Sequence, residues 1–357
     1  MRKKNWKKII MIAVGMLFAV YTVGSVCLIN YFVKFYFSKS DRVNFSTLLR
    51  WKDYENFERE MVTFPSGKET LTGYIYGKDN TSLGLVVVSH GLTRDSEEYM
   101  NETKYFVDHG FMVFAFDNTG SGKSTGESYR GLAQSVIDLD NALKYVEQNP
   151  LFDGLPICLY GHSWGGYATT AVLNCDHDIA AVASLAGYNS CMQQMYYSGE
   201  KAVGSLAAIE KPFMWLMQYL RFGDKMMLTA VDGINHASDT AVMIVQGNLD
   251  DFVGYDGPCI YNNRDKITNP NVKYVVLEGR EHDDLMFDYG EDRRNYKKEV
   301  DEEYESLKEQ YDGKIPDEVR LEWSNSVDKK LLSELNEELF ADIVEFYKQA
   351  IENWSAQ

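Results

Sequence analysis

A short apolar run leads directly into a glycine-rich turn and then into a helical pattern, and this succession constrains the fold more than any other segment. The run is Ile157–Tyr160, the turn is Gly161–Gly166 (Gly-His-Ser-Trp-Gly-Gly), and the helical pattern continues to Leu173. Glycines two residues before and two residues after Ser163 allow a sharp reversal without side-chain clashes. The turn therefore predicts a serine hydroxyl above the end of a strand, at a helix N-terminus that favours developing negative charge.

Further apolar runs alternate with helical patterns along the chain. The runs are Leu85–Val88, Phe111–Phe116, Ile179–Leu185, Val242–Val245 and Val272–Leu277, and a hairpin is predicted from Met61–Pro65 and Leu71–Tyr76. Helical patterns occur at Glu97–Val107, Ala133–Glu147, Gly165–Leu173 and Tyr255–Lys266. Unbroken hydrophobicity indicates strands buried on both faces. The alternation therefore predicts an α/β fold with a mostly parallel central sheet flanked by helices.

Two segments break this rhythm and predict additions to the sheet. Residues 188–238 are rich in Met, Tyr and Trp and are too long for a simple crossover, so we expect an inserted helical cap whose side chains either line a pocket or pack on the core. Residues 289–330 are charge-dense and predict a solvated helical insertion. The amphipathic pattern of Leu331–Trp354 predicts a final helix against the sheet, which completes a domain spanning residues 61–357.

The N-terminal region predicts a membrane anchor over residues 1–38, followed by a connector over residues 39–60. Arg2, Lys3, Lys4, Lys7 and Lys8 precede Ile9–Val33, a 25-residue stretch without Asp, Glu, Lys, Arg or His. Such a stretch is long enough to span a bilayer. The basic cluster favours a cytoplasmic N-terminus and an extracytoplasmic catalytic domain. The alternative is a signal peptide cleaved near Val23–Ser25, which would leave a secreted protein.

Charge and cysteine content exclude several classes of partner. Residues 1–40 hold seven Lys or Arg and no acid, so the rest of the chain carries 29 Lys and Arg against 53 Asp and Glu. An acidic body disfavours nucleic acid. The five cysteines show no paired spacing, so neither a disulfide framework nor a metal site is predicted, and no cofactor is expected.

A serine nucleophile needs a base, and the base needs a carboxylate that orients it. In chains built around this kind of turn the order is serine, acid, histidine, each after a strand. The run Val242–Val245 leads to two candidate acids, Asp250 and Asp251, of which the spacing from Gly247 to Val253 favours Asp250. The last apolar run leads to His282, the only histidine after them. We therefore predict Ser163 as nucleophile, Asp250 as acid and His282 as base.

Of two other loops, one is predicted to contribute to catalysis and the other to have only a structural role. Ser89–Leu92 follows the first buried strand, and we expect the backbone N–H groups of Leu92 and Trp164 to form an oxyanion hole. The segment Asp117–Ser124 ends like a phosphate-binding loop, but Asp117 stands where that loop needs glycine. Because a carboxylate there would repel phosphate, no nucleotide is expected and the loop is predicted to be structural.

Taken together, these segments make the chain similar to the α/β-hydrolase superfamily, and more narrowly to its serine aminopeptidase and monoacylglycerol-lipase-like branch. The matching segments span roughly residues 60–285 and the final helix. The resemblance implies attack by Ser163 on an acyl carbonyl and an acyl-enzyme released by water. An esterase or lipase acting on a small-molecule acyl ester is the leading interpretation. A membrane-anchored peptidase, with Glu200 or Glu210 holding a substrate amine, and an inactive binding protein are the alternatives.

Overall fold

The computed structural model describes residues 6–39, 45–78 and 82–354, and within these residues it contains one eight-stranded sheet. The strand order is β1-β2-β4-β3-β5-β6-β7-β8. β2 is antiparallel to β1 and to β4, and the remaining neighbours are parallel. The strands are β1 Arg59–Ser66, β2 Glu69–Tyr76, β3 Leu85–Ser89, β4 Met112–Phe116, β5 Ile157–His162, β6 Ile179–Leu185, β7 Ala241–Gly247 and β8 Val272–Leu277. The mostly parallel sheet predicted from the apolar runs is confirmed.

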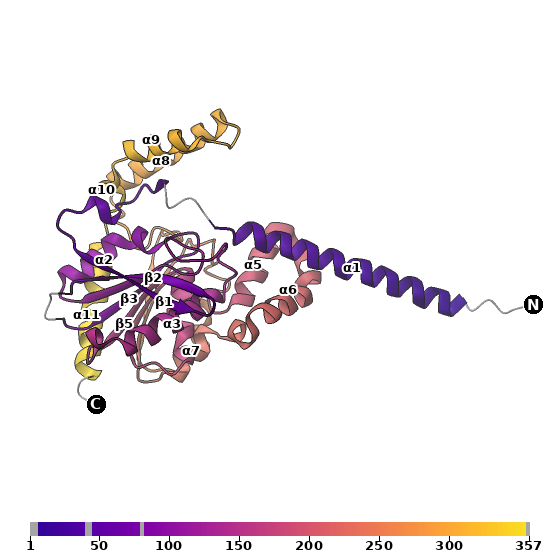
Figure 1. Cartoon of the computed structure of the whole chain (residues 1–357), viewed down its shortest axis with the longest axis horizontal. Helices are drawn as coiled ribbons and strands as arrows, with labels where there is room; N and C mark the ends of the chain where they lie inside the picture. The colour runs from indigo at the N-terminus through magenta and orange to yellow at the C-terminus, as the bar shows by residue number, and fades with distance from the viewer. Residues whose placement is uncertain (1–5, 40–44, 79–81, 355–357) are drawn as a thin grey trace, which may run out of the picture.

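Helices cover both faces of this sheet, which is why the central strands are apolar without alternation. Val87 and Leu159 point into one core and Val86 and Tyr160 into the other, because successive side chains of a strand face opposite ways. The first face is covered by α3 (Gln134–Gln148), α4 (Trp164–Ala171) and α7 (Ala230–His236), and the second by α2 (Met100–Asp108) and α11 (Glu337–Trp354) (Figure 1). The strands β3, β5, β7 and β8 are parallel, so their carboxyl ends lie at the same end of the sheet. The loops that carry the predicted site residues begin there.

Two expectations from the apolar pattern are wrong. β8 is not buried on both faces, since Lys273 and Tyr274 are exposed. It lies at the edge of the sheet, where one side of the strand has no neighbouring strand. The helix predicted over Tyr255–Lys266 is only a 3-10 turn at its end, from Tyr261 to Lys266. Gly257 and Pro258 stand in the first part of that segment, and both residue types oppose helix formation.

The segment between β6 and β7 forms two cap helices, α5 (Cys191–Val203) and α6 (Ala207–Phe222), before α7 returns to pack on α4. α1 (Trp6–Tyr36) lies beside these helices and continues well beyond them towards the N-terminus (Figure 1). It packs on α6. α1 is long and apolar enough to cross a membrane by length and composition, as a signal sequence also can be.

The charge-dense segment forms a separate helical arm. It consists of α8 (Glu291–Gln310), α9 (Asp317–Ser326) and the short α10 (Lys329–Leu332). A small apolar cluster of Val300, Val327 and Leu332 holds the arm together. The arm projects from the sheet on the side away from α7, and the chain then returns through α11 (Figure 1).

Candidate active site

The glycine-rich turn places Ser163 between β5 and α4 in a backbone conformation that few residues adopt. Its φ is 58° and its ψ is −112°, and its N–H donates to the carbonyl oxygen of Leu185 at 2.8 Å. A Cβ on Gly161 would overlap the carbonyl of Gly165, so the turn closes only with glycine there. The strained serine at a strand-to-helix junction is the geometry expected of a nucleophile elbow.

Three predicted site residues from three different loops meet at this turn. The Ser163 hydroxyl donates to Nε2 of His282 at 2.8 Å, and Nδ1–H of His282 donates to Oδ2 of Asp250 at 2.9 Å. The Asp250 side chain is fully buried and that of His282 is 12% exposed. This arrangement gives the serine a proton acceptor and fixes the ring orientation of that acceptor.

The loop after β7 holds Asp250 in its ionised form. Burial alone raises the pKa of this carboxyl group, but the hydrogen bonds from His282, the Val253 N–H and Gln246 outweigh burial and lower the pKa below its ordinary value. Gln246 Nε2 donates to Oδ2 at 2.8 Å. The competing acid Asp251 is 84% exposed and pairs with Lys201 of α5. Of the two acids that the sequence left open, only Asp250 contacts the histidine.

The two predicted oxyanion donors lie on the two segments that adjoin the serine. Trp164 is the first residue of α4, and Leu92 follows the tight loop after β3. These segments touch, because a Cβ on Gly165 would overlap the carbonyl oxygen of Ser89. His90 is buried in the same loop and its Nε2 accepts from the Asn118 N–H at 2.9 Å, which is a structural role.

His162 is a residue of this site that the sequence did not single out. It is buried; its Nε2–H donates to the backbone carbonyl of His282 at 3.0 Å and its Nδ1 accepts from the Tyr99 hydroxyl at 3.1 Å. Tyr99 in turn accepts from the Gly91 N–H at 2.9 Å. Burial, followed by the neighbouring His282, lowers the pKa of His162 to about 3, so it stays neutral. His162 thus joins the loop after β3, the glycine-rich turn and the His282 loop.

Replacing His162 by Leu is expected to lower kcat by about 10–100-fold with little change in KM, since misplacing a reacting group by ~1 Å can cost that much. His162→Gln keeps a donor for the His282 carbonyl and should retain more activity. Steady-state kinetics on a soluble ester, with circular dichroism to check folding, measure both. The matched control is His236→Leu, at a side chain 61% exposed on α7. An unchanged kcat in folded His162→Leu would contradict the positioning role.

The phosphate-loop-like segment is filled by its own carboxylate. Asp117 is buried and accepts hydrogen bonds from the N–H groups of Ser96 at 3.0 Å and Lys123 at 2.9 Å. A Cβ on Gly122 would overlap the Asp117 carboxylate. The backbone donors that would face a phosphate in a nucleotide-binding loop are therefore used internally, which gives the loop the structural role predicted for it.

One group of possible metal ligands coincides with the site. Ring nitrogens of His162 and His282 and a carboxylate oxygen of Asp283 lie within 4.8 Å of one another. Both ring nitrogens of His282 are already hydrogen-bonded to Ser163 and Asp250, and Asp283 pairs with Arg94 at 3.0 Å. These atoms are engaged in the protein's own hydrogen bonds and ion pairs, so the cluster does not fit a metal.

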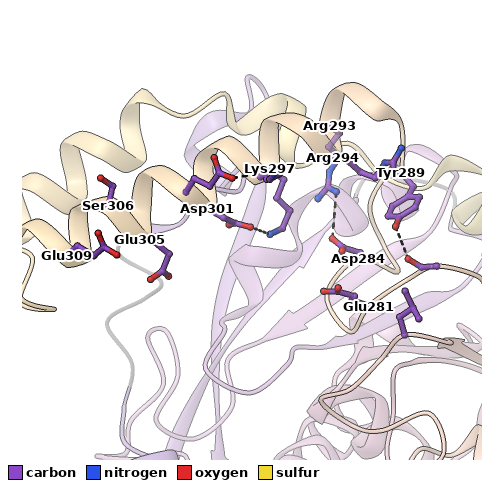
Figure 2. A pocket seen from close by; sticks show the side chains of 14 residues that line it. Glu281, Asp284, Tyr289, Arg293, Arg294, Lys297, Asp301, Glu305, Ser306 and Glu309 are labelled. Carbon is purple, nitrogen blue, oxygen red and sulfur yellow. Dashed lines mark hydrogen bonds and ion pairs between the residues drawn. The ribbon is translucent and has the colours of Figure 1, made fainter.

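An open cleft of about 530 Å³ lies between α8 and the loop that carries Glu281. Its lining is mostly charged, and Ser163 and His282 are not part of it. Figure 2 shows Lys297 paired with Asp301 on α8 and Asp284 directed towards the start of the same helix. Leu249 and Glu281, which line the cleft, are the direct neighbours of Asp250 and His282 in the chain. The charged arm thus borders the site from outside without entering it.

Comparisons with known proteins cover part of the chain. Residues 80–231 match a family model described as serine aminopeptidase, S33. Human monoglyceride lipase is 32% identical over 87 residues, which are 24% of this chain and 28% of that protein. A polyketide transferase of Penicillium sp is 28% identical over 120 residues, 33% of this chain and 40% of the relative. The chain thus matches less than half the length of these curated relatives.

A solved structure of a Pyrococcus furiosus esterase is 22% identical, with a TM-score of 0.49 over 63% of this chain and 84% of that one. The sheet order found here is that of the α/β-hydrolase fold, and the family model and the monoglyceride lipase match agree with that fold. Within that fold class the chain is similar to the serine aminopeptidase and monoacylglycerol-lipase-like branch, so the resemblance predicted from the sequence is confirmed.

Proposed function

We propose that the protein is a membrane-anchored serine esterase, lipase-like in its substrate, with Ser163 as nucleophile, His282 as base and Asp250 as the orienting acid. The observation that carries the proposal is the pair of hydrogen bonds, 2.8 Å and 2.9 Å long, that join these three side chains at a strained strand-to-helix turn. A relative named as a monoglyceride lipase supports ester hydrolysis as the reaction.

The reaction proceeds in two halves. His282 takes the Ser163 proton as Oγ bonds to the acyl carbon, and Asp250 stabilises the imidazolium. The N–H groups of Leu92 and Trp164 stabilise the oxyanion, each contributing about 2.7–4 kcal/mol by analogy with other oxyanion donors. His282 then returns the proton to the leaving alcohol, which departs. Water activated by the same histidine attacks the acyl-enzyme and releases the carboxylic acid and Ser163.

An ester is favoured over a peptide because Glu200 and Glu210, the two cap carboxylates considered as ligands of a substrate amine, both have other partners. Glu200 pairs with Lys211 at 3.2 Å. Glu210 accepts from the hydroxyls of Tyr21 and Ser25 on α1, at 3.2 Å each. A peptidase that binds the free amino group of its substrate needs a carboxylate directed at that group. By contrast, the apolar ring of Phe252 lies 4.8 Å from the His282 ring and is 61% exposed, which suits an acyl chain.

The N-terminal helix supports an uncleaved anchor. Ser25, Ile29 and Val33 of α1 are buried against the rest of the protein, and Tyr21 contacts α6. Cleavage near Val23–Ser25 would remove the Tyr21 contact. Lys7 and Lys8 stand at the start of α1, while Arg2, Lys3 and Lys4 lie outside the described residues. With the basic end in the cytoplasm, the catalytic domain lies outside the cell membrane.

Labelling with a fluorophosphonate probe tests the nucleophile. We expect the full-length wild type in detergent to label and Ser163→Ala to remain unlabelled, because the probe forms a bond only with an activated serine. Ser326→Ala, at an exposed serine of α9, is the control and should label like wild type. A folded wild type that does not label would refute the serine hydrolase.

Comparing p-nitrophenyl acyl esters with aminoacyl anilides then separates the two enzyme classes. The proposal requires faster turnover of the esters and loss of that turnover in Ser163→Ala. Faster turnover of the anilides would contradict the esterase and favour a peptidase, with Ser163 still the proposed nucleophile.

A further inference from the structure

The outer face of α6 is apolar and uncovered. Exposed apolar side chains recur there at three- and four-residue spacing, and we call them the α6 stripe: Ile209, Trp215, Leu216, Tyr219 and Leu220, with exposed fractions from 39% to 76%. On the opposite face Ala207, Gln218 and Phe222 are buried against the protein. A helix with one apolar face on the protein core usually turns a polar face to water. An uncovered apolar stripe of this kind indicates a binding surface.

α1 lies directly beside this stripe. The side of α1 that faces the rest of the protein carries Tyr21, Ser25, Ile29 and Val33 at four-residue spacing, and buried Phe37 follows just after the helix ends. The rings of Tyr21 and Phe213 of α6 meet edge to face, with centroids 5.5 Å apart. Together with the hydrogen bonds of Glu210 to α1, this contact fixes the two helices side by side.

The position of these contacts along α1 sets the depth of α6. A helix crosses the hydrocarbon core of a bilayer in about 20 residues, at 1.5 Å per residue. Counted from Ile9, where the apolar stretch begins, the core extends to about Leu28. Tyr21 and Ser25 then lie within about 10 Å of its outer surface. The part of α6 that touches them shares that layer, which is where interfacial helices bury their apolar face.

The composition of the cap fits the same layer. Trp215 and Tyr219 are stacked with centroids 5.1 Å apart, and such rings gather at the boundary between headgroups and acyl chains. Residues 191–227 carry four basic and three acidic side chains, in a body that is otherwise strongly acidic. The cap is thus repelled less by an anionic lipid surface than the acidic body as a whole.

We propose that the α6 stripe is embedded in the outer leaflet of the bilayer that α1 spans, so that the cap rests on lipid. The cap also reaches the site, because Gln194 of α5 donates to the Phe252 carbonyl at 3.1 Å, beside His282. Given the esterase proposed above, on which this second step rests, the substrate is an acyl ester that enters from the bilayer.

Fluorescent labels on the stripe test the surface without any assay of activity. Full-length chain lacking Cys27 and Cys175, the exposed and half-buried cysteines, is labelled with NBD at Leu220→Cys and reconstituted into phosphatidylcholine vesicles. Leu321→Cys on α9, where Leu321 is 46% exposed, is the matched control. We expect doxyl lipid to quench the Leu220 label at least about fivefold more than the control, and aqueous iodide to show the reverse. Iodide quenching of both labels, or shielding of the Leu220 label from both quenchers, would overturn the lipid contact.

Charged substitutions test the route of the substrate. Leu216→Glu with Leu220→Glu should lower hydrolysis of a long-chain acyl ester carried in vesicles by about tenfold, because two charges oppose entry of the stripe into lipid. Turnover of soluble p-nitrophenyl acetate should not change, and Leu321→Glu should affect neither. Equal loss on both substrates, or on neither, would overturn entry from the bilayer. A wild type that hydrolyses no ester refutes the esterase, while the quenching result still decides the lipid contact.

Discussion

Replacing Ser163 or His282 by Ala is expected to lower kcat for ester hydrolysis by about 10⁴–10⁶-fold. The double variant is expected to have the same kcat as the less active of the two single variants. The hydroxyl of Ser163 and Nε2 of His282 share one hydrogen bond of 2.8 Å. Each therefore depends on the other, because the serine needs a proton acceptor, and without the serine no acyl-enzyme forms on which the histidine could direct water. Groups that act as one unit lose their whole effect when either is removed.

Steady-state kinetics of the purified full-length chain on a soluble p-nitrophenyl ester measure this effect. Ser326→Ala and His236→Ala replace the same residue types at exposed positions on α9 and α7 and should keep wild-type rates. The prediction fails if the factor by which kcat falls in the double variant equals the product of the factors in the two single variants, since the two residues would then act independently.

The presence of a mostly parallel sheet and the succession of strands and helices along the chain were predictable, because both depend on local sequence patterns. Each buried strand is a run of apolar residues, and β6 and β8 have the predicted limits. The candidate site residues were predicted from their order after the strands, and the spacing from Gly247 to Val253 favoured Asp250 over Asp251. Leu92 and Trp164 could be placed by the same reasoning. The carboxyl ends of parallel strands lie at the same end of the sheet. Residues that directly follow such strands can therefore be expected to lie close together.

What the sequence could not give depends on contacts between distant residues. The role of His162 comes from its hydrogen bond to the backbone of His282, 120 residues away, and its only sequence signal is its place next to Ser163. β8 was grouped with the central strands because most of its residues are apolar, although it contains Lys273, and the strand order places it at the edge of the sheet. Glu210 was read as a possible substrate ligand, whereas Tyr21 and Ser25, some 185 residues earlier, hold it.

Neighbouring acids give the sharpest test of the site, because Asp250 and Asp251 differ in environment and not in chemistry. Asp250→Asn is expected to lower kcat by about 10⁴-fold, as loss of the orienting carboxylate does in other hydrolases with this triad. Asp251→Asn should change it by less than about fivefold, because an exposed ion pair contributes roughly 0–1 kcal/mol. Kinetics on one soluble ester, with matched expression and thermal melting of both variants, measure the difference.

The direction of the Asp250→Asn effect follows from the hydrogen bonds around the carboxylate. The N–H groups of Phe252 and Val253 both donate to Oδ1, at 3.0 Å each, so the amide oxygen of Asn takes that position. The amide nitrogen then replaces Oδ2, where Gln246 Nε2 and His282 Nδ1–H both donate. A donor in that place favours the tautomer with the proton on Nε2, which leaves Ser163 without an acceptor. A larger loss in Asp251→Asn than in Asp250→Asn would contradict this assignment of the acid.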